Sequence, residues 1–422
     1  MTGGVFPDQG RRPRAIVALN ALGRGLRRFG IGDALDADQM VAAARKRTGL
    51  EDFGDSYFDS AFRVLVESIN EEARLSTVGR LVQRQQIVGL LANRLRVEDL
   101  LRRHPEIHEL DVGRIILIAG MQRTGTTLMQ RLLASNPAVR SLSAWEALNP
   151  VPLPGEGRAD CHRRVRLAKA SERTLAYLAP TLFAIHPIEH DAPEEDILLL
   201  DLTFMSQTFE ATMHVPSYAR WLEQQDQSKA YKYLRTLMKI LVWQRPGDVW
   251  VLKTPQHLEH LDVVLEVLPK TTIVQTHRDP VIAVASFCSM VAHARGMMSE
   301  HVDPGEISAH WIPKVRRALA LAMEVRATVP PSRFVDVSYY DLLDDPLTVL
   351  RRVYKALRLD FGPAAEAALA AARASNRQHR YGRHAYDAAD FGISCRRIED
   401  CFAWYRARFG IPTEPARDGS RS

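Results

Sequence analysis

The chain has 422 residues, of which 46% are hydrophobic and 25% charged, ordinary values for a globular protein long enough to bury a core without disulfides or metal ions. Its formal net charge of +6 fits an anionic ligand or surface, and because no dense Lys/Arg stripe with interleaved aromatics is present, no nucleic-acid partner is expected. The four cysteines form no Cys-x-x-Cys pair, which argues against a metal site and indicates a reducing, cytoplasmic location.

Residues 1–35 form a basic N-terminal segment, of which the first 14 residues predict a loose tail. A basic helix after this tail would carry one apolar stripe, made of Leu19, Leu22, Leu26 and Phe29. Such a helix either docks on the protein or makes a peripheral contact with a membrane surface. No apolar run in the chain approaches ~18 residues, so no transmembrane helix is expected.

Residues 36–110 predict an all-helical extension. Apolar residues from Phe58 to Ile69 recur at helical spacing, and a second periodic run covers residues 81–101. No strand-like run interrupts this segment.

A strand, a glycine-containing loop and a helix follow. Residues 115–119 are short, apolar and β-branched, which is typical of a buried parallel strand. Gly120 and Gly125 have Walker-like spacing, but threonines stand where a nucleoside triphosphatase places Lys-Ser/Thr. Such a loop can hold a phosphate at a helix N-terminus, yet it is poorly equipped to move a γ-phosphoryl group. Arg123 puts a permanent cation inside the loop.

Three later strands are predicted at residues 249–252, 271–276 and 334–337, each followed by a helical pattern. Alternating strands and helices predict an α/β fold with a P-loop-like parallel sheet flanked by helices, preceded by the helical extension.

A second candidate phosphate site follows the strand at residues 271–276. Arg278 lies at the end of this strand and Ser286 eight residues later, two turns into the next helix. The pair can hold a phosphate through charge-assisted hydrogen bonds. The structural alternative is that Arg278 pairs with Asp279 or a surface carboxylate.

Residues 123–129, Arg-Thr-Gly-Thr-Thr-Leu-Met, resemble the 5'-phosphosulfate loop of sulfotransferases, most closely that of the tyrosylprotein and bacterial branch. Arg278 and Ser286 match the pair that binds the 3'-phosphate of the donor PAPS (3'-phosphoadenosine 5'-phosphosulfate) in that family. Tyr339 resembles the tyrosine that contacts adenine. The resemblance covers about residues 112–360. It implies contacts to the donor from Arg123, Thr124, Gly125, Thr126 and Thr127.

The same resemblance suggests residues for sulfuryl transfer to an acceptor hydroxyl. Glu146 stands near the glutamate base of the tyrosylprotein branch and is the expected base, with His257 and His190 as competitors. Arg123 and Lys253 are expected to stabilise charge on the leaving group, and no step requires a metal.

Residues 111–415 then form the sulfotransferase domain, with residues 150–244 as a helical insertion that builds the acceptor site. The aromatic residues of this insertion fit a lipid or glycolipid acceptor but equally fit a core; they are Phe183, Phe204, Phe209, Trp221 and Trp243. The C-terminal Arg-Lys-Gly phosphate motif of cytosolic sulfotransferases is absent, and the candidates to replace it are Arg380, Arg383 and His384.

Two other functions stay open at this point. The first is a P-loop kinase or nucleoside triphosphatase, which lacks support because the Walker lysine is missing. The second is a non-catalytic nucleotide-binding protein. The acceptor and the oligomeric state are not specified by the sequence.

Overall fold

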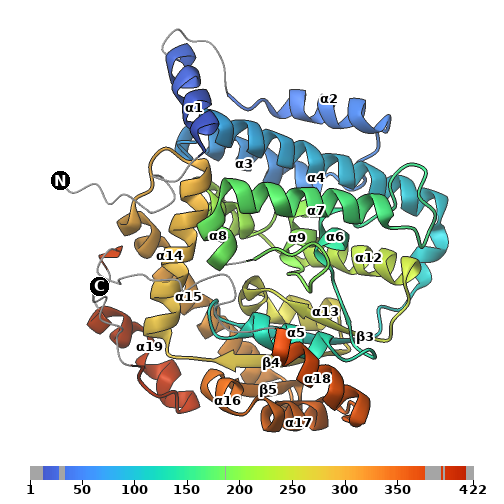
Figure 1. Cartoon of the computed structure of the whole chain (residues 1–422), viewed down its shortest axis with the longest axis vertical. Coiled ribbons are helices and arrows are strands. Elements are labelled where there is room, and N and C mark those ends of the chain that lie inside the picture. Colours follow the sequence, from blue (N-terminus) through green and yellow to red (C-terminus); the bar gives the residue numbers. More distant parts are fainter. Residues whose placement is uncertain (1–12, 28–33, 186, 376–390, 393–394, 415–422) are drawn as a thin grey trace.

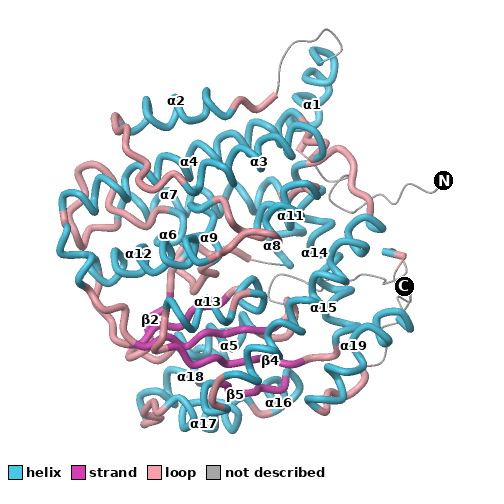
Figure 2. The backbone as a smooth tube through the Cα atoms, turned by 180° about the vertical axis from the view of Figure 1, so that it is seen from behind, coloured by secondary structure: helices cyan, strands magenta, loops and turns pink. Residues whose placement is uncertain are grey.

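The computed structural model describes residues 13–27, 34–185, 187–375, 391–392 and 395–414. At its centre is a parallel five-stranded sheet in the order β2-β3-β1-β4-β5. The strands are β1 (Arg114–Gly120), β2 (Arg140–Ser141), β3 (Val249–Lys253), β4 (Thr271–His277) and β5 (Phe334–Ser338), seen in magenta in Figure 2. The α/β class and the four predicted strands are confirmed, and the short edge strand β2 is an addition.

Alternate residues of β1 bury against two different helical layers because successive side chains leave opposite faces of a strand. Ile116 and Ile118 join a cluster with the helices beneath the sheet in Figure 1, whereas Ile115 and Leu117 join the larger core above it. Each such fully buried side chain contributes roughly 1.5–3 kcal/mol. The helices of this cluster are α5 (Thr126–Ala134), α16 (Tyr339–Asp344), α17 (Pro346–Leu357) and α18 (Pro363–Ser375), and the last three lie at the bottom of Figure 1.

The larger core lies between the sheet and the N-terminal helices. Its central members are α12 (Ser228–Gln244), α13 (Leu261–Val267), α14 (Pro280–Met298), α15 (Pro304–Thr328) and α19 (Cys395–Phe409). Two 3-10 turns, η3 (Pro255–Glu259) and η4 (Pro331–Arg333), connect them to the strands. α14 has the length and apolarity of a membrane span, but 89% of that stretch is buried inside the protein, so it serves as a core helix.

The predicted helical extension is confirmed. It consists of α1 (Arg14–Arg27), α2 (Ala37–Thr48), α3 (Tyr57–Glu72), α4 (Thr77–Arg103) and the 3-10 turn η1 (Pro105–Glu109). These helices cover the top of the molecule in Figure 1. Phe58 and Phe62 of α3 pack against Phe204, so the extension shares its hydrophobic core with the later part of the chain.

The segment between β2 and β3 is helical. It contains α6 (Ala144–Leu148), α7 (His162–Leu178), α8 (Pro180–Ile185), α9 (Ile197–Leu200), η2 (Asp201–Thr203), α10 (Thr208–Thr212) and α11 (Pro216–Leu222) before α12. Phe204, Phe209 and Trp243 are buried in the core, so the core interpretation holds for these three. Trp221 packs against the core and Phe183 is half-buried.

Candidate functional site

The loop between β1 and α5 has a backbone that few sequences allow. Gly125, the residue before α5, has φ +87°, and a Cβ there would lie 2.9 Å from the ring of Tyr339. Arg123 adopts φ 69°, a left-handed conformation that is strained for a residue with a side chain and that occurs preferentially at functional sites. No side chain caps the N-terminus of α5, and the first N–H groups of a helix have no intrahelical acceptors. The loop therefore presents backbone donors suited to an anion.

The loop's three threonines differ in their accessibility. Thr124 is fully buried, donates to the Met121 carbonyl at 2.7 Å and lies 2.7 Å from the Thr276 hydroxyl of β4. Thr126 is also buried, whereas Thr127 is exposed. Thr124 thus ties the loop to the sheet, and Thr127 offers the accessible hydroxyl.

The two predicted phosphate-binding regions meet at this loop. Arg123 Nε donates to Ser286 Oγ at 3.1 Å, across 163 residues of sequence. Arg278 Nη1 donates to the Arg123 carbonyl at 2.9 Å, and the Arg278 guanidinium lies 4.2 Å from the centroid of the Tyr339 ring. Arg278 follows β4 and Ser286 lies in α14, and the carboxyl ends of parallel strands share one edge of a sheet. Four predicted site residues therefore form one basic cluster.

Arg278 also has an acidic partner near the C-terminus. Its Nε and Nη2 atoms donate to the two carboxylate oxygens of Glu414 at 2.7 and 3.0 Å. The structural alternative, in which Arg278 pairs with a carboxylate, therefore holds alongside its contacts with the phosphate loop. Arg380, Arg383 and His384 lie outside the described residues.

Lys253 reaches the phosphate loop from the end of β3. Its side chain is 2% exposed, and its Nζ donates to Glu195 at 2.5 Å and to the Thr127 hydroxyl at 3.4 Å. The chain thus supplies a lysine at this loop from a neighbouring strand rather than from the Walker position. Glu195 was not among the predicted site residues.

The Glu146 carboxylate is held by hydrogen bonds and ion pairs within the protein. Both of its oxygens accept hydrogen bonds: from Arg140 at 2.7 Å, from the Ser143 backbone N–H at 3.0 Å, and from Arg245 at 3.1 Å. With Ser143 it forms the capping box of α6, and it is 1% exposed. This arrangement favours a structural role over the predicted role of base. The signal was present in the sequence, since Ser-x-x-Glu is the capping-box pattern.

The two histidine candidates are also engaged. His257 is buried, with Nε2 2.8 Å from Asp196 and Nδ1 3.0 Å from the Tyr231 hydroxyl. Asp196 also accepts the Lys253 backbone N–H at 2.9 Å, so His257 helps to fix the end of β3. His190 Nδ1 lies 2.6 Å from Glu172 of α7. These contacts favour positioning roles for both histidines.

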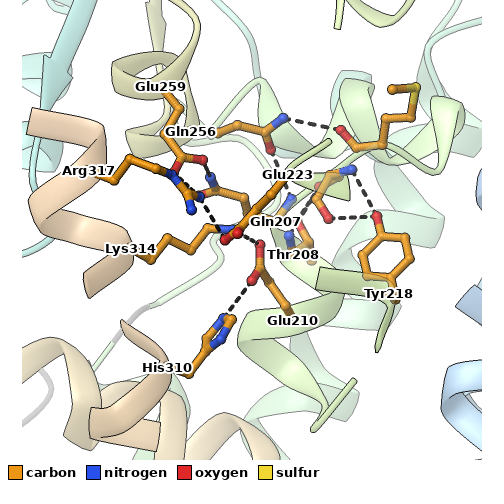
Figure 3. A network of polar contacts seen from close by, with 12 residues as sticks. Gln207, Thr208, Glu210, Tyr218, Glu223, Gln256, Glu259, His310, Lys314 and Arg317 are labelled. Carbon is orange, nitrogen blue, oxygen red and sulfur yellow. Dashed lines mark hydrogen bonds and ion pairs between the residues drawn. The ribbon is translucent and has the colours of Figure 1, made fainter. Parts of the chain in front are cut away.

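Figure 3 shows an ionic network around Lys314 and Arg317 of α15, in which Lys314 and Glu210 are buried. Lys314 Nζ donates to Glu210 at 2.7 Å, and Glu210 also accepts from His310 at 2.7 Å. Burial alone would raise the pKa of Glu210, but the Lys314 charge and the hydrogen bond with His310 lower it below its ordinary value. Arg317 joins Glu223 to Glu259, whose pKa is raised by burial.

A small cavity separates this network from the loop. It has a volume of about 20 Å³ and is lined by residues that include Gln122, Gln207, Glu259 and Lys314. That space suits one water molecule rather than a substrate. The ion pairs of this network connect α10, the residue after α11, η3 and α15. Among the described residues, no group of three or more His, Cys, Asp or Glu side chains is arranged to hold a metal ion.

Comparison with known proteins finds clear relatives. A family model described as the sulfotransferase family matches residues 116–363. The chain is 30% identical to sulfotransferase STF1 from Mycobacterium tuberculosis H37Rv, with a TM-score of 0.78 over 88% of this chain and 99% of that one. It is 26% identical to sulfotransferase STF9 from Mycobacterium avium, with a TM-score of 0.82 over 91% and 99% of the two chains.

A curated relative from Mycobacterium bovis carries the name omega-hydroxy-beta-dihydromenaquinone-9 sulfotransferase Stf3. It is 25% identical over 258 residues, which are 58% of this chain. The chain spans 62% of that relative, less than two thirds of its length. Together these matches confirm the resemblance that the phosphate loop indicated.

Proposed function

The chain belongs to the sulfotransferase family, and from that premise we propose that it transfers a sulfuryl group from PAPS to a hydroxyl of a lipid acceptor. The main support for PAPS as the donor is a cluster of side chains at one loop: Arg123, Ser286, Arg278 and Tyr339. PAPS carries phosphate at both its 5' and 3' positions, and the cluster offers separate groups for each. Backbone N–H groups of α5 with Arg123 and Thr127 would hold the 5' end, and Arg278 with Ser286 the 3'-phosphate.

The lysine of β3 supports transfer rather than binding alone. When bound, the donor supplies the sulfuryl group and a leaving phosphate; the chain must supply cations for the leaving oxygen and a base for the acceptor proton. Lys253 is a buried cation 3.4 Å from the accessible Thr127 hydroxyl. Its partner Glu195 contacts Lys253 directly, whereas Glu146 is held by Arg140, Ser143 and Arg245, so we assign Glu195 as base in preference to Glu146. A kinase function is not supported, because the loop has no lysine at the Walker position.

Two observations support a lipid acceptor. The Mycobacterium bovis relative is named as a sulfotransferase of omega-hydroxy-beta-dihydromenaquinone-9, a hydroxylated menaquinone lipid. In this chain α8 ends at the donor loop, because Arg123 Nη1 donates to the Ile185 carbonyl at 3.4 Å. α8 also carries the half-buried apolar side chains Leu182 and Phe183. An apolar acceptor next to the donor is consistent with both observations.

The test is transfer of label from PAPS carrying radioactive sulfate to a panel of acceptors in detergent: a hydroxyl-terminated prenyl lipid, a glycolipid and a tyrosine peptide. We expect label in the prenyl lipid, and its loss in Glu195→Gln. Transfer to the peptide instead would refute the lipid assignment. Binding of adenosine 3',5'-bisphosphate without transfer to any acceptor would support the non-catalytic alternative.

We also propose that this is a cytoplasmic enzyme that touches a membrane through α1. Asn20 docks α1 on α4 by accepting the Val78 N–H at 3.0 Å, and α1 contains arginines and no acidic residue. Its exposed large apolar side chains are Val17, Leu19 and Leu22. An exposed apolar stripe with basic flanks fits an anionic lipid surface, where a lipid acceptor would reside. The side chain of Leu26 and residue Phe29 of the predicted stripe lie outside the described part of the chain.

Vesicle co-sedimentation tests this contact. The full chain is expected to pellet with vesicles containing phosphatidylglycerol, and Leu22→Ser to lose binding. Leu343→Ser, an exposed leucine on α16, is the matched control and should bind like the unaltered chain. Equal pelleting of both variants would refute a role for α1. The free thiols Cys161, Cys288 and Cys401 are compatible with the reducing cytoplasm.

A further inference from the structure

The end of the described chain lies on the candidate 3'-phosphate site. After α19 the chain turns back, with the Ile411 N–H donating to the Arg406 carbonyl at 3.0 Å and Ile411 buried. This turn brings Glu414 to the start of α14, where its backbone N–H donates to Asp279 at 2.8 Å. The Glu414 carboxylate then accepts two parallel hydrogen bonds from the Arg278 guanidinium.

A carboxylate held in this way imitates a phosphate. The arginine fork binds carboxylate and phosphate oxygens with the same paired geometry, and the two anions compete for the same N–H groups. The Tyr340 hydroxyl adds a third hydrogen bond to Glu414 at 3.0 Å. Burial, with the nearby Glu414 charge, raises the pKa of Tyr340 to about 12, so this hydroxyl stays protonated at neutral pH.

Arg278 does not depend on Glu414 for its position. Its Nη1 atom donates to the Arg123 carbonyl, and its guanidinium stacks on the Tyr339 ring. Both contacts come from elements other than the C-terminal segment. Loss of Glu414 should therefore leave the guanidinium in place with its Nε and Nη2 atoms turned toward a new anion.

We propose that Glu414 is an internal competitor for the 3'-phosphate of the donor nucleotide. In the free enzyme its carboxylate occupies the Arg278 fork, and a 3'-phosphate displaces it on binding. The C-terminal segment thereby acts as a latch on the donor site. A nucleotide that lacks a 3'-phosphate places no group in the Arg278 fork, so Glu414 can keep its contacts with Arg278 while such a nucleotide binds. This inference rests on the proposed donor, PAPS.

The test measures calorimetric affinities of the full-length protein for adenosine 3',5'-bisphosphate and for AMP. Glu414→Gln keeps the size of the side chain and removes its charge. Glu399→Gln, an exposed carboxylate on α19, is the matched control. We expect Glu414→Gln to bind the bisphosphate about tenfold more tightly than the wild type, equivalent to 1.4 kcal/mol, with AMP affinity unchanged within about twofold. Glu399→Gln should match the wild type for both ligands.

Three results would overturn the inference. Unchanged bisphosphate affinity in Glu414→Gln would mean that the carboxylate does not compete. Weaker bisphosphate binding in that variant would make Glu414 a positioning residue for Arg278. If neither the wild type nor the variant binds the bisphosphate, the proposed donor itself is wrong, and the latch is refuted with it.

Discussion

Replacing Glu146 with glutamine distinguishes a structural from a catalytic role for this residue. The side chains of Glu146 and Arg140 are 2% and 8% exposed, and the Arg140 guanidinium also stacks on Trp250 at 4.2 Å. Burial lowers the pKa of Arg140 to about 10, and the Glu146 carboxylate opposes this shift because it stabilises the charged guanidinium. Removing one partner of a buried ion pair costs about 3–5 kcal/mol. The second partner, Arg245, is 55% exposed and adds little.

We therefore expect Glu146→Gln to lose about 3 kcal/mol of unfolding free energy, since glutamine retains hydrogen bonding to the α6 cap. Turnover per folded molecule should stay within about threefold if the contacts of Glu146 are structural, because loss of a general base lowers rates by about 10²–10⁴-fold. The assay combines urea unfolding, followed by tryptophan fluorescence, with turnover measured well below the transition. Glu195→Gln is the comparison variant, and its turnover per folded molecule should fall by about 10²–10⁴-fold. A hundredfold fall in turnover of Glu146→Gln with an unchanged unfolding midpoint would refute this reasoning.

Three further predictions concern the loop, the lysine and a buried acid. Gly125→Ala should weaken bisphosphate binding by at least about tenfold, because φ +87° is strained for alanine and its Cβ would press on the Tyr339 ring; wild-type affinity in calorimetry would contradict this. Lys253→Met should lower kcat by about 10²–10³-fold at a similar KM for PAPS, whereas a change confined to KM would show that the lysine only binds the donor. Burial raises the pKa of Asp201 to about 7, above 3.8, so the unfolded chain ionises first and native stability falls between about pH 4 and pH 7. Asp201→Asn should lack this pH dependence, so the difference in free energy of unfolding between the two proteins should change by up to roughly 4 kcal/mol between pH 4 and pH 8. A difference that stays constant across this range would contradict the prediction.

Much of the sheet could be predicted from the sequence because β1, β3 and β4 are buried on both faces over most of their length, whereas buried and half-buried residues alternate along the edge strand β5. β1, β3, β4 and β5 were each predicted from a short, mainly apolar or β-branched run, and the predicted bounds differ from the observed ones by at most one residue at either end. β2 was missed because two residues carry no periodic signal. The convergence of Arg123 and Arg278 was predictable, since each follows a strand of one parallel sheet.

The roles of Glu195 and Glu414 could not be predicted from the sequence, because they depend on contacts between distant segments. Neither glutamate lies in a segment with a repeating pattern. Glu195 pairs with Lys253 at the end of β3, and Glu414 pairs with Arg278 after β4. Glu146 was predicted as base from its place after the first helix, although its capping-box spacing from Ser143 indicated a structural use.

The central claim is that the loop and Arg278 bind a nucleotide with both 5'- and 3'-phosphates. The most direct measurement is the melting temperature of the protein in separate titrations with adenosine 3',5'-bisphosphate and with ATP and magnesium, because a ligand stabilises the state that binds it. We predict a large, saturable rise with the bisphosphate and a small one with ATP and magnesium. Equal and negligible shifts, or a larger shift with ATP and magnesium, would contradict the assignment of PAPS as donor.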